Sequence, residues 1–177
     1  CIIFVEMESS GKNNNKRWLW RMYIINMDRV VNPRPVSFMC EEENGLQRGL
    51  FLQVVGMAKN NHWLNDEDDF EAYKVQLAGT GVEKHDLLIH TSVPNMYDER
   101  KVEQDYVLEK GQVGRGHYIT TGDEYTLPVD MVGGELAVGA EVALAGNGKL
   151  QVGENGIGEV VRVYNFNGQE SVMIRFY

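Results

Sequence analysis

The last forty-four residues, GELAVGAEVALAGNGKLQVGENGIGEVVRVYNFNGQESVMIRFY, run from Gly134 to Tyr177 and decide the fold. Gly and Asn divide this stretch into short apolar runs at 141–145, 150–152, 157–164 and 171–177. Asn147-Gly148 and Asn167-Gly168 each separate two runs, and both dipeptides suit the positive-φ positions of a type I′ turn. The last run alternates, with Val172, Ile174 and Phe176 on one face. The stretch predicts a meander of short antiparallel strands with an architectural role.

The rest of the chain repeats this pattern of short apolar runs between turn residues. No segment shows a helical apolar period longer than two turns. Two glycine clusters, GQVGRG at 111–116 and GENGIG at 153–158, match no phosphate-binding motif, so we interpret them as turn glycines. The sequence predicts an all-β, or nearly all-β, sandwich or barrel body of about ten short strands. Further strands are expected at 36–39, 49–57, 70–77, 86–92, 106–109, 116–121 and 125–129.

The N-terminal region differs from the body in composition. We predict an extended arm over residues 1–37 and a β-rich body over 38–177, with Gly133-Gly134 as a candidate sub-boundary within the body. The segment RWLWRMYIINM, residues 17–27, alternates like a strand and is the most aromatic part of the arm. An exposed strand of this kind invites pairing, so it completes either this chain's own sheet or the sheet of a neighbouring copy.

Charge is unevenly distributed between the predicted arm and body. The whole chain carries −9, whereas residues 1–37 hold six basic and three acidic side chains, leaving −12 for the remainder. An acidic body argues against nucleic-acid binding, because phosphate contacts need a positive surface. The basic arm is either a solvated tail or a segment that docks on an acidic partner, including another copy of this chain.

The residues that usually carry catalysis or metal binding occur here without the required spacing. Cys1 and Cys40 stand at no metal-ligand spacing, and we expect both thiols to be free. The four histidines match no zinc motif, and no Ser or Cys has the glycines of a nucleophile elbow. Four consecutive acids at 66–69 lack the alternation of an EF-hand loop. We therefore expect no enzymatic activity, no metal and no cofactor, and no apolar run is long enough to cross a membrane.

The exposed aromatic residues are the better candidates for a functional surface. Trp63 lies in a polar loop that offers little core, so we interpret it as an anchor against another protein. Together with the aromatic part of the arm it gives a predicted partner-binding set: Arg17, Trp18, Trp20, Arg21, Tyr23 and Trp63.

Two passages of the chain share a pattern of short strands and glycine turns: NMYDERKVEQDYVLEKGQVGRGHYITTGDEYTL, residues 95–127, and VGAEVALAGNGKLQVGENGIGEVVRVYNFNGQESVMIRFY, residues 138–177. Both passages resemble the head decoration, or capsid cement, proteins of tailed bacteriophages. The C-terminal passage is similar to the ending of phage β-tulip or β-barrel decoration domains, with a glycine turn before Lys149-Leu150 and a last alternating strand. These are strand-and-turn patterns and contain no catalytic signature.

The resemblance implies a structural virion protein that is made in the host bacterial cytoplasm and ends up on the capsid surface. Its partners would be the major capsid protein, whose neighbouring subunits it clamps, and copies of itself, with a trimer among the expected assemblies. The alternative functions are a phage head-fibre or host-surface, glycan-binding module, and an enzyme with an unrecognised pair of acidic residues. Neither nucleic acid nor a membrane is expected as a partner.

Overall fold

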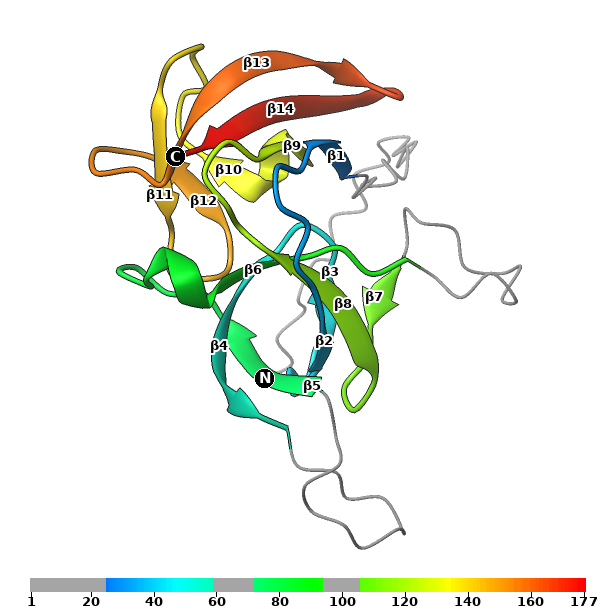
Figure 1. The fold of residues 1–177 in the computed structure, drawn as a ribbon. Coiled ribbons are helices and arrows are strands. Elements are labelled where there is room, and N and C mark those ends of the chain that lie inside the picture. The colour runs from blue at the N-terminus through cyan, green and yellow to red at the C-terminus, as the bar shows by residue number, and fades with distance from the viewer. Residues whose placement is uncertain (1–24, 59–71, 94–105) are drawn as a thin grey trace, which may run out of the picture.

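The computed structural model describes residues 25–58, 72–93 and 106–177, and in this part of the chain it confirms the predicted all-β fold. Two β units lie one above the other, a closed barrel and a strongly curled sheet (Figure 1). The barrel contains β2 (Pro35–Met39), β4 (Phe51–Met57), β5 (Ala72–Leu77), β6 (Leu87–His90) and β8 (Val113–Tyr118), in the order β2-β5-β4-β6-β8.

The second unit is a seven-stranded sheet in the order β1-β9-β14-β13-β11-β12-β10. Its strands are β1 (Asn26–Arg29), β9 (Glu124–Pro128), β10 (Val132–Gly133), β11 (Glu141–Leu144), β12 (Leu150–Val152), β13 (Gly158–Phe166) and β14 (Gln169–Phe176). The 3₁₀ turn η3 (Val129–Met131) joins β9 directly to β10, although these strands lie far apart in this order. Because so short a link spans only a few ångströms per residue, the sheet must curl to bring these strands together.

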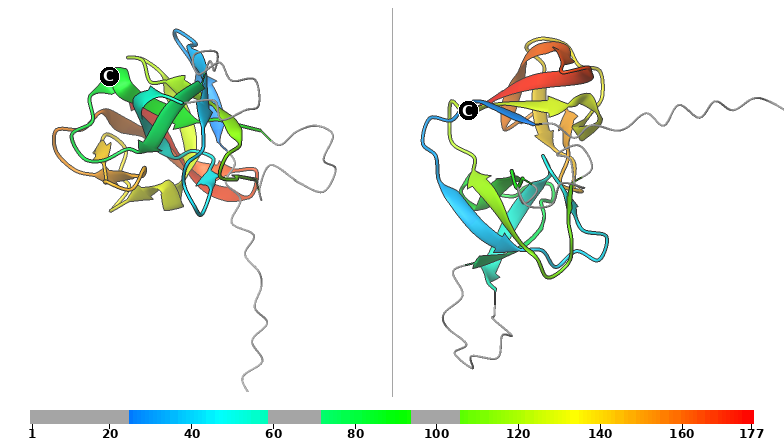
Figure 2. Two further views of the ribbon diagram at one scale, coloured as in Figure 1. Left: turned by 90° about the horizontal axis from the view of Figure 1, so that it is seen from below. Right: turned by 90° about the vertical axis from the view of Figure 1, so that its right-hand side faces the viewer.

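Smaller elements complete the described structure. β3 (Leu46–Gln47) pairs with β7 (Val107–Leu108), and the 3₁₀ turn η1 (Lys84–Asp86) leads into β6. No helix among the described residues is long and apolar enough to cross a membrane. Figure 2 shows the barrel and the sheet from two further sides.

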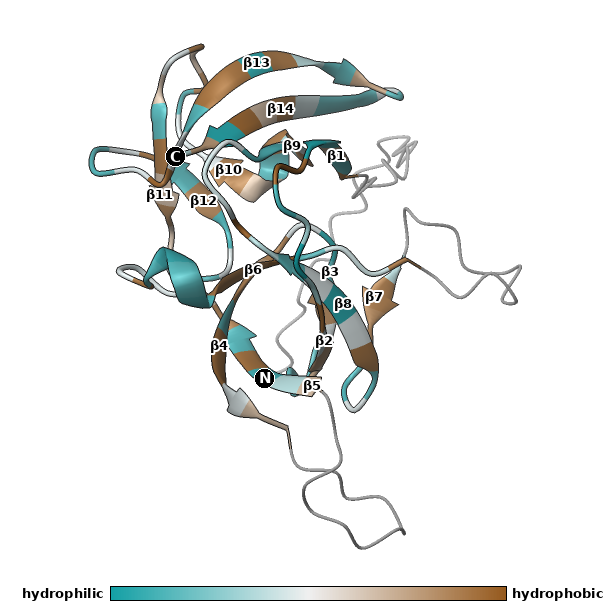
Figure 3. Ribbon diagram, viewed as in Figure 1, coloured by the Kyte–Doolittle hydropathy of each residue, from teal (hydrophilic) through white to brown (hydrophobic). Residues whose placement is uncertain are grey.

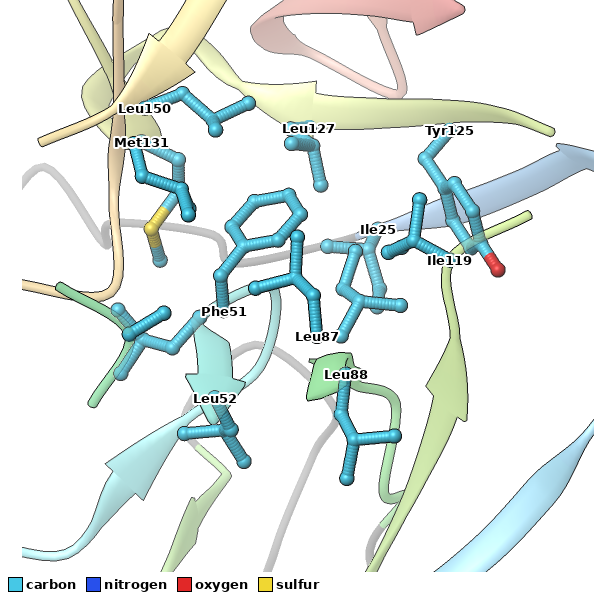
Figure 4. Close-up of a cluster of buried hydrophobic side chains, with 14 of the residues drawn as sticks. Ile25, Phe51, Leu52, Leu87, Leu88, Ile119, Tyr125, Leu127, Met131 and Leu150 are labelled. Atoms are coloured by element: carbon cyan, nitrogen blue, oxygen red, sulfur yellow. The ribbon is translucent and has the colours of Figure 1, made fainter. Parts of the chain in front are cut away.

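One hydrophobic core runs through both units, because two barrel strands are buried on both faces. Leu52 and Leu88 are directly paired and point into the barrel, whereas Phe51 and Leu87 point toward the sheet (Figure 4). Alternate residues of a strand lie on opposite faces, so a strand between two cores must be apolar at every position. This explains the apolar run Leu87–Ile89 of β6, visible as brown ribbon in Figure 3; the last residue of the strand, His90, is the buried polar exception.

The C-terminal strands follow their predicted pattern. Val172, Ile174 and Phe176 are fully buried, and the intervening Arg175 is exposed. Asn167 and Gly168 both have positive φ, 51° and 85°, and they connect Phe166 to its partner Gln169. This is the predicted type I′ hairpin, and β13–β14 is the longest strand pair of the described structure.

The predicted type I′ turn at Asn147-Gly148 is wrong. The positive φ values fall on Gly146 and Gly148, and the Ala145 amide donates to the Lys149 carbonyl at 2.8 Å, which closes a longer loop. Tertiary contact explains the difference. The Phe51 amide donates to the Gly148 carbonyl at 2.7 Å, so this loop lies directly against a barrel strand.

The glycines of the 111–116 cluster were also only partly predicted. Gly111 lies in a turn, but Gly114 and Gly116 lie inside β8. A Cβ at Gly114 would come within 2.8 Å of Phe38 Cζ and 2.4 Å of Leu108 Cδ2. A Cβ at Gly116 would lie 3.0 Å from the Ile89 carbonyl oxygen and 3.4 Å from Phe38 Cε1. Both glycines therefore lie where β8 packs too closely against its neighbours for a side chain.

The division of the chain also differs from the one suggested by composition. Residues 26–29 and 35–37, which lie in the predicted arm, pair into the sheet and the barrel respectively. The prediction of an arm therefore stays a prediction for residues 1–24, which are outside the described residues. The chain crosses from the barrel to the sheet at 119–123. The strands before and after Gly133-Gly134, β10 and β11, both belong to the seven-stranded sheet, so the two units do not meet at Gly133-Gly134.

Candidate interaction surface

All six side chains predicted to bind a partner lie outside the described residues. Arg17, Trp18, Trp20, Arg21, Tyr23 and Trp63 therefore stay predictions. What the structure does define is the place where the predicted docking segment joins the body, at Ile25 and β1.

Ile25 fixes this junction in the core. Its side chain is 7% exposed and belongs to the cluster between barrel and sheet (Figure 4). A Cβ at Gly49 would lie 3.0 Å from Ile25 Cγ2, and Gly49 has φ +83°, so a larger residue is excluded there on both grounds. The next residues form β1, which pairs antiparallel with β9 at the border of the seven-stranded sheet. A pull on the chain before Ile25 would therefore be transmitted to the shared core.

A hydrogen-bonded network ties β1 to the long hairpin across the outer face of the sheet. The Thr126 hydroxyl donates to Asp28 Oδ2 at 2.6 Å and lies 2.8 Å from the Tyr164 hydroxyl. Since the Thr126 proton goes to the carboxylate, the Tyr164 hydroxyl is the donor to Thr126. Asn26 Nδ2 donates to the other oxygen of Asp28 at 2.8 Å. These side chains thus join β1, β9 and β13, in addition to the ladders that pair β1 with β9, β9 with β14 and β14 with β13.

Asp123 also links separate segments by hydrogen bonds, at the point where the chain crosses between the two units. Its side chain is fully buried, and its Oδ1 accepts a hydrogen bond from the Val31 amide at 2.8 Å. Its Oδ2 accepts from the amide and the hydroxyl of Thr120, at 2.8 and 2.9 Å. A buried carboxylate is tolerated when its oxygens are bonded in this way. The residue joins the β1–β2 connection to the β8–β9 connection.

An open depression of about 810 Å³ lies at this junction, lined by Arg34, Glu83, Lys84, His85, Tyr118, Ile119, Thr120 and Thr121. The Lys84 ammonium donates to Thr121 Oγ1 at 2.8 Å and to the main-chain oxygen of Tyr177. Partial burial lowers the pKa of Lys84. His85 lies between Glu83 and Asp86, at 3.2 and 3.5 Å. These charges are engaged within the chain, so we interpret the depression as part of the joint between the units.

His90 is a buried core histidine. Its Nδ1 lies 2.7 Å from the Gln47 carbonyl and therefore carries the proton, and the Phe38 ring meets it edge-on at 5.3 Å. Burial lowers its pKa to about 4, so the ring is neutral at pH 7. Within the described segments, no three His, Cys, Asp or Glu side chains are grouped to hold a metal ion. Cys40 is buried and free, as predicted for this residue.

The outer half of β13, which sequence reasoning assigned only as a strand, has one open side in the described part of the chain. β11 pairs with β13 at Gly158 and Glu159, and main-chain bonds from Gly139 and to Ala140 extend this contact to Val160. Beyond Val160, the paired neighbour of β13 among the described strands is β14 alone. The turn end of the β13–β14 hairpin extends beyond the neighbouring strands of the sheet (Figure 1).

Side chains along this projecting segment form a cluster on one face. The Arg162 guanidinium lies over the Tyr164 ring, 4.6 Å from its centroid, and Tyr164 meets Phe166 edge-on at 6.2 Å. Val163, on the other face, is 43% exposed. The alternation VRVYNF over residues 161–166 was the available signal, but sequence alone does not show that one side of this strand lacks a neighbour.

Comparison with known proteins assigns the chain to no family. No family model matches the chain, and no curated protein matches it. One solved structure, the N base of the head fibre protein gp8.5 of bacteriophage phi29, aligns over 81% of this chain and 95% of its own, at 12% identity and a TM-score of 0.41. At this TM-score the similarity does not establish a shared fold or a shared function.

Proposed function

We propose that this chain is a structural virion protein that binds the outside of an assembled bacteriophage capsid and clamps neighbouring major-capsid subunits. The observation that carries the proposal is the anchoring of the chain at Ile25 and β1, which gives the predicted docking segment a fixed start on an all-β body. The resemblance of residues 95–127 and 138–177 to decoration proteins supports it. We expect no enzymatic activity, and turnover on a panel of polysaccharides would contradict this expectation.

In this proposal residues 17–24 supply the contact and the body supplies the anchor. A protein that binds the assembled lattice, and not its separate subunits, stabilises the lattice by mass action. Many copies on one lattice make a modest affinity per site sufficient. The buried Ile25 and the Asp28–Thr126–Tyr164 network would carry the load from the contact into the core.

Truncation tests the proposal, and the structure dictates where to cut. Removal of residues 1–24 leaves Ile25 and β1 in place, whereas a longer deletion would remove part of the core. We expect the truncated protein to melt within a few degrees of the full chain and to lose binding to expanded heads of the encoding phage in co-sedimentation. The full-length triple variant Trp18→Ala, Trp20→Ala, Tyr23→Ala should show the same loss. Unchanged occupancy by a folded truncated protein would overturn the assignment.

A head-fibre or host-surface, glycan-binding module is the second candidate. One observation favours it: the projecting β13–β14 hairpin carries Tyr164 and Phe166 beside Arg162, and aromatic and arginine side chains dominate recognition surfaces. A glycan array distinguishes the two functions. Hits that disappear in Trp63→Ala or Phe166→Ala, with no binding to capsids, would favour the second candidate.

A further inference from the structure

The free side of β13 over residues 161–166 has a defined set of outward-facing backbone groups. In a two-residue hairpin the residues flanking the turn, here Phe166 and Gln169, form a hydrogen-bonded pair, and the pairs alternate from there. Asn165 and Val163 are therefore at non-hydrogen-bonded positions relative to β14. Their N–H and C=O groups point away from β14, toward the side where the described structure places no strand.

The two strands that end the seven-stranded sheet, β1 and β10, are protected against pairing with another chain. Residues 161–166 of β13 are less protected. β1 has four residues, two of them charged, with a register shift at Asp28, and β10 has two residues. Short length, charge and bulges are the usual devices that block the pairing of sheet edges. The β13 segment has six residues with one charge, Arg162, and a bulge only at its inner end, between Val160 and Arg162.

We propose that this segment is a self-association surface, on which β13 of a second copy of this chain pairs antiparallel about a two-fold axis at Tyr164. In this register Val163 lies opposite Asn165 of the second copy, and the reverse pair is equivalent. Both pairs use the outward-facing groups, so each exchanges two main-chain hydrogen bonds. The two sheets then form one continuous sheet across the dimer. The proposal does not depend on capsid binding.

Charge and side-chain chemistry favour a second copy over an unrelated strand. With the axis at Tyr164, Arg162 lies opposite Phe166 of the second copy, so no like charges face each other across the axis. This placement repeats between chains the arginine–aromatic contact that the structure contains within one chain, between Arg162 and Tyr164. The pairing segment also lies toward the outside of the molecule, because Figure 1 shows the turn end of the hairpin extending beyond the neighbouring strands of the sheet.

Sedimentation of the full chain over a wide concentration range tests the proposal. We expect a reversible monomer–dimer equilibrium. Val163→Pro removes an outward N–H without touching the β13–β14 ladder, so it should weaken dimerisation at least about tenfold. Val163→Lys should weaken it too, while its control, Val138→Lys at another exposed valine, should not. Melting curves establish that each variant folds. A chain that stays monomeric at every concentration, or dimers indifferent to both substitutions, would overturn the proposal.

A cysteine on the axis supplies a second test that detects even weak association. Non-hydrogen-bonded partners in an antiparallel pair have Cα atoms about 4.5 Å apart, which is within the range that a disulfide bridges. In a Cys1→Ser background, with Cys40 buried, we expect Tyr164→Cys to form a covalent dimer under mild oxidation. The control Glu170→Cys, exposed on β14, should crosslink far more slowly. Equal rates for the two cysteines would contradict the register, as would pairing of this strand only with a different protein.

Discussion

The barrel and the seven-stranded sheet are built from similar short strands but differ in whether their edge strands are paired. The barrel is closed, and its strands β4 and β6 contribute buried residues to both faces. The sheet stays open, with β1 at one border and the outer half of β13 projecting from it. Closure removes unpaired backbone groups, whereas an open sheet keeps them available. The difference means that the described barrel strands pair on both sides, whereas the outer half of β13 in the sheet keeps backbone groups free to pair.

The largest loss of stability should follow from truncating Phe51, whose side chain packs between the two units. Phe51 is fully buried and its ring lies 5.8 Å from that of Phe176. We expect Phe51→Ala to lower the free energy of unfolding by about 4 kcal/mol, as for other large core truncations. Calorimetry should show one transition for both units, since they share a core. The exposed Val138→Ala is the control, with an effect near zero. Two separate transitions in the wild type would break the description of one shared core.

Acidification should destabilise the whole molecule through a buried histidine of the barrel. The folded pKa of His90, about 4, is below the ordinary value of 6.5, so the unfolded chain takes up the proton first as the pH falls. Stability is therefore complete above pH 6.5 and declines between 6.5 and 4, by roughly 3 kcal/mol at most. Burial lowers the pKa of His117 as well, which acts in the same direction.

Denaturant titrations at several pH values measure this dependence. His90→Leu should reduce the slope of stability between pH 4 and 6.5, and the slope that remains should come in part from His117. A slope as steep in His90→Leu as in the wild type would assign the dependence to other groups.

A methyl group inside the barrel should have the next largest effect. Gly114→Ala places a Cβ within 2.8 Å of Phe38 Cζ, so we expect a loss of about 2 kcal/mol from overpacking. Gly79→Ala is a matched control, because no atom lies within 4 Å of its Cβ position. Chemical denaturation measures both variants. Equal stabilities would show that the inner face of β8 is less tightly packed than the distances indicate.

The smallest loss of stability should follow from a substitution on the outer face of the open sheet. Thr126→Val removes the hydroxyl that joins Asp28 to Tyr164, and we expect a loss of about 1 kcal/mol. Amide hydrogen exchange should increase in β1 and in the outer half of β13, with the barrel unaffected. Thr91→Val, which removes a barrel hydroxyl 2.8 Å from His117 Nδ1, is the control with intact exchange in β1. Faster exchange throughout the molecule would remove the distinction between the two units.

The candidate surfaces were only partly accessible to sequence reasoning. The aromatic segment at 17–27 and Trp63 were chosen by their expected exposure, and these predictions concern residues mostly outside the described structure. The free side of β13 was missed, because a strand's own residues do not reveal whether a neighbour stands beside it. Its alternating residues predicted the strand correctly, and tertiary structure alone showed that β11 stops at its inner end.

Local features could be predicted from the residues alone: the all-β class, the alternation of Val172, Ile174 and Phe176, and the hairpin at Asn167-Gly168. These features depend on side-chain period and turn chemistry within a few residues. Three other features emerged only from the packed molecule: the pairing of β1 with β9, the crossing at 119–123, and the close approach of Phe38 to Gly114. Each of these arises from packing between residues far apart in the chain, and such contacts leave no periodic signal in either segment.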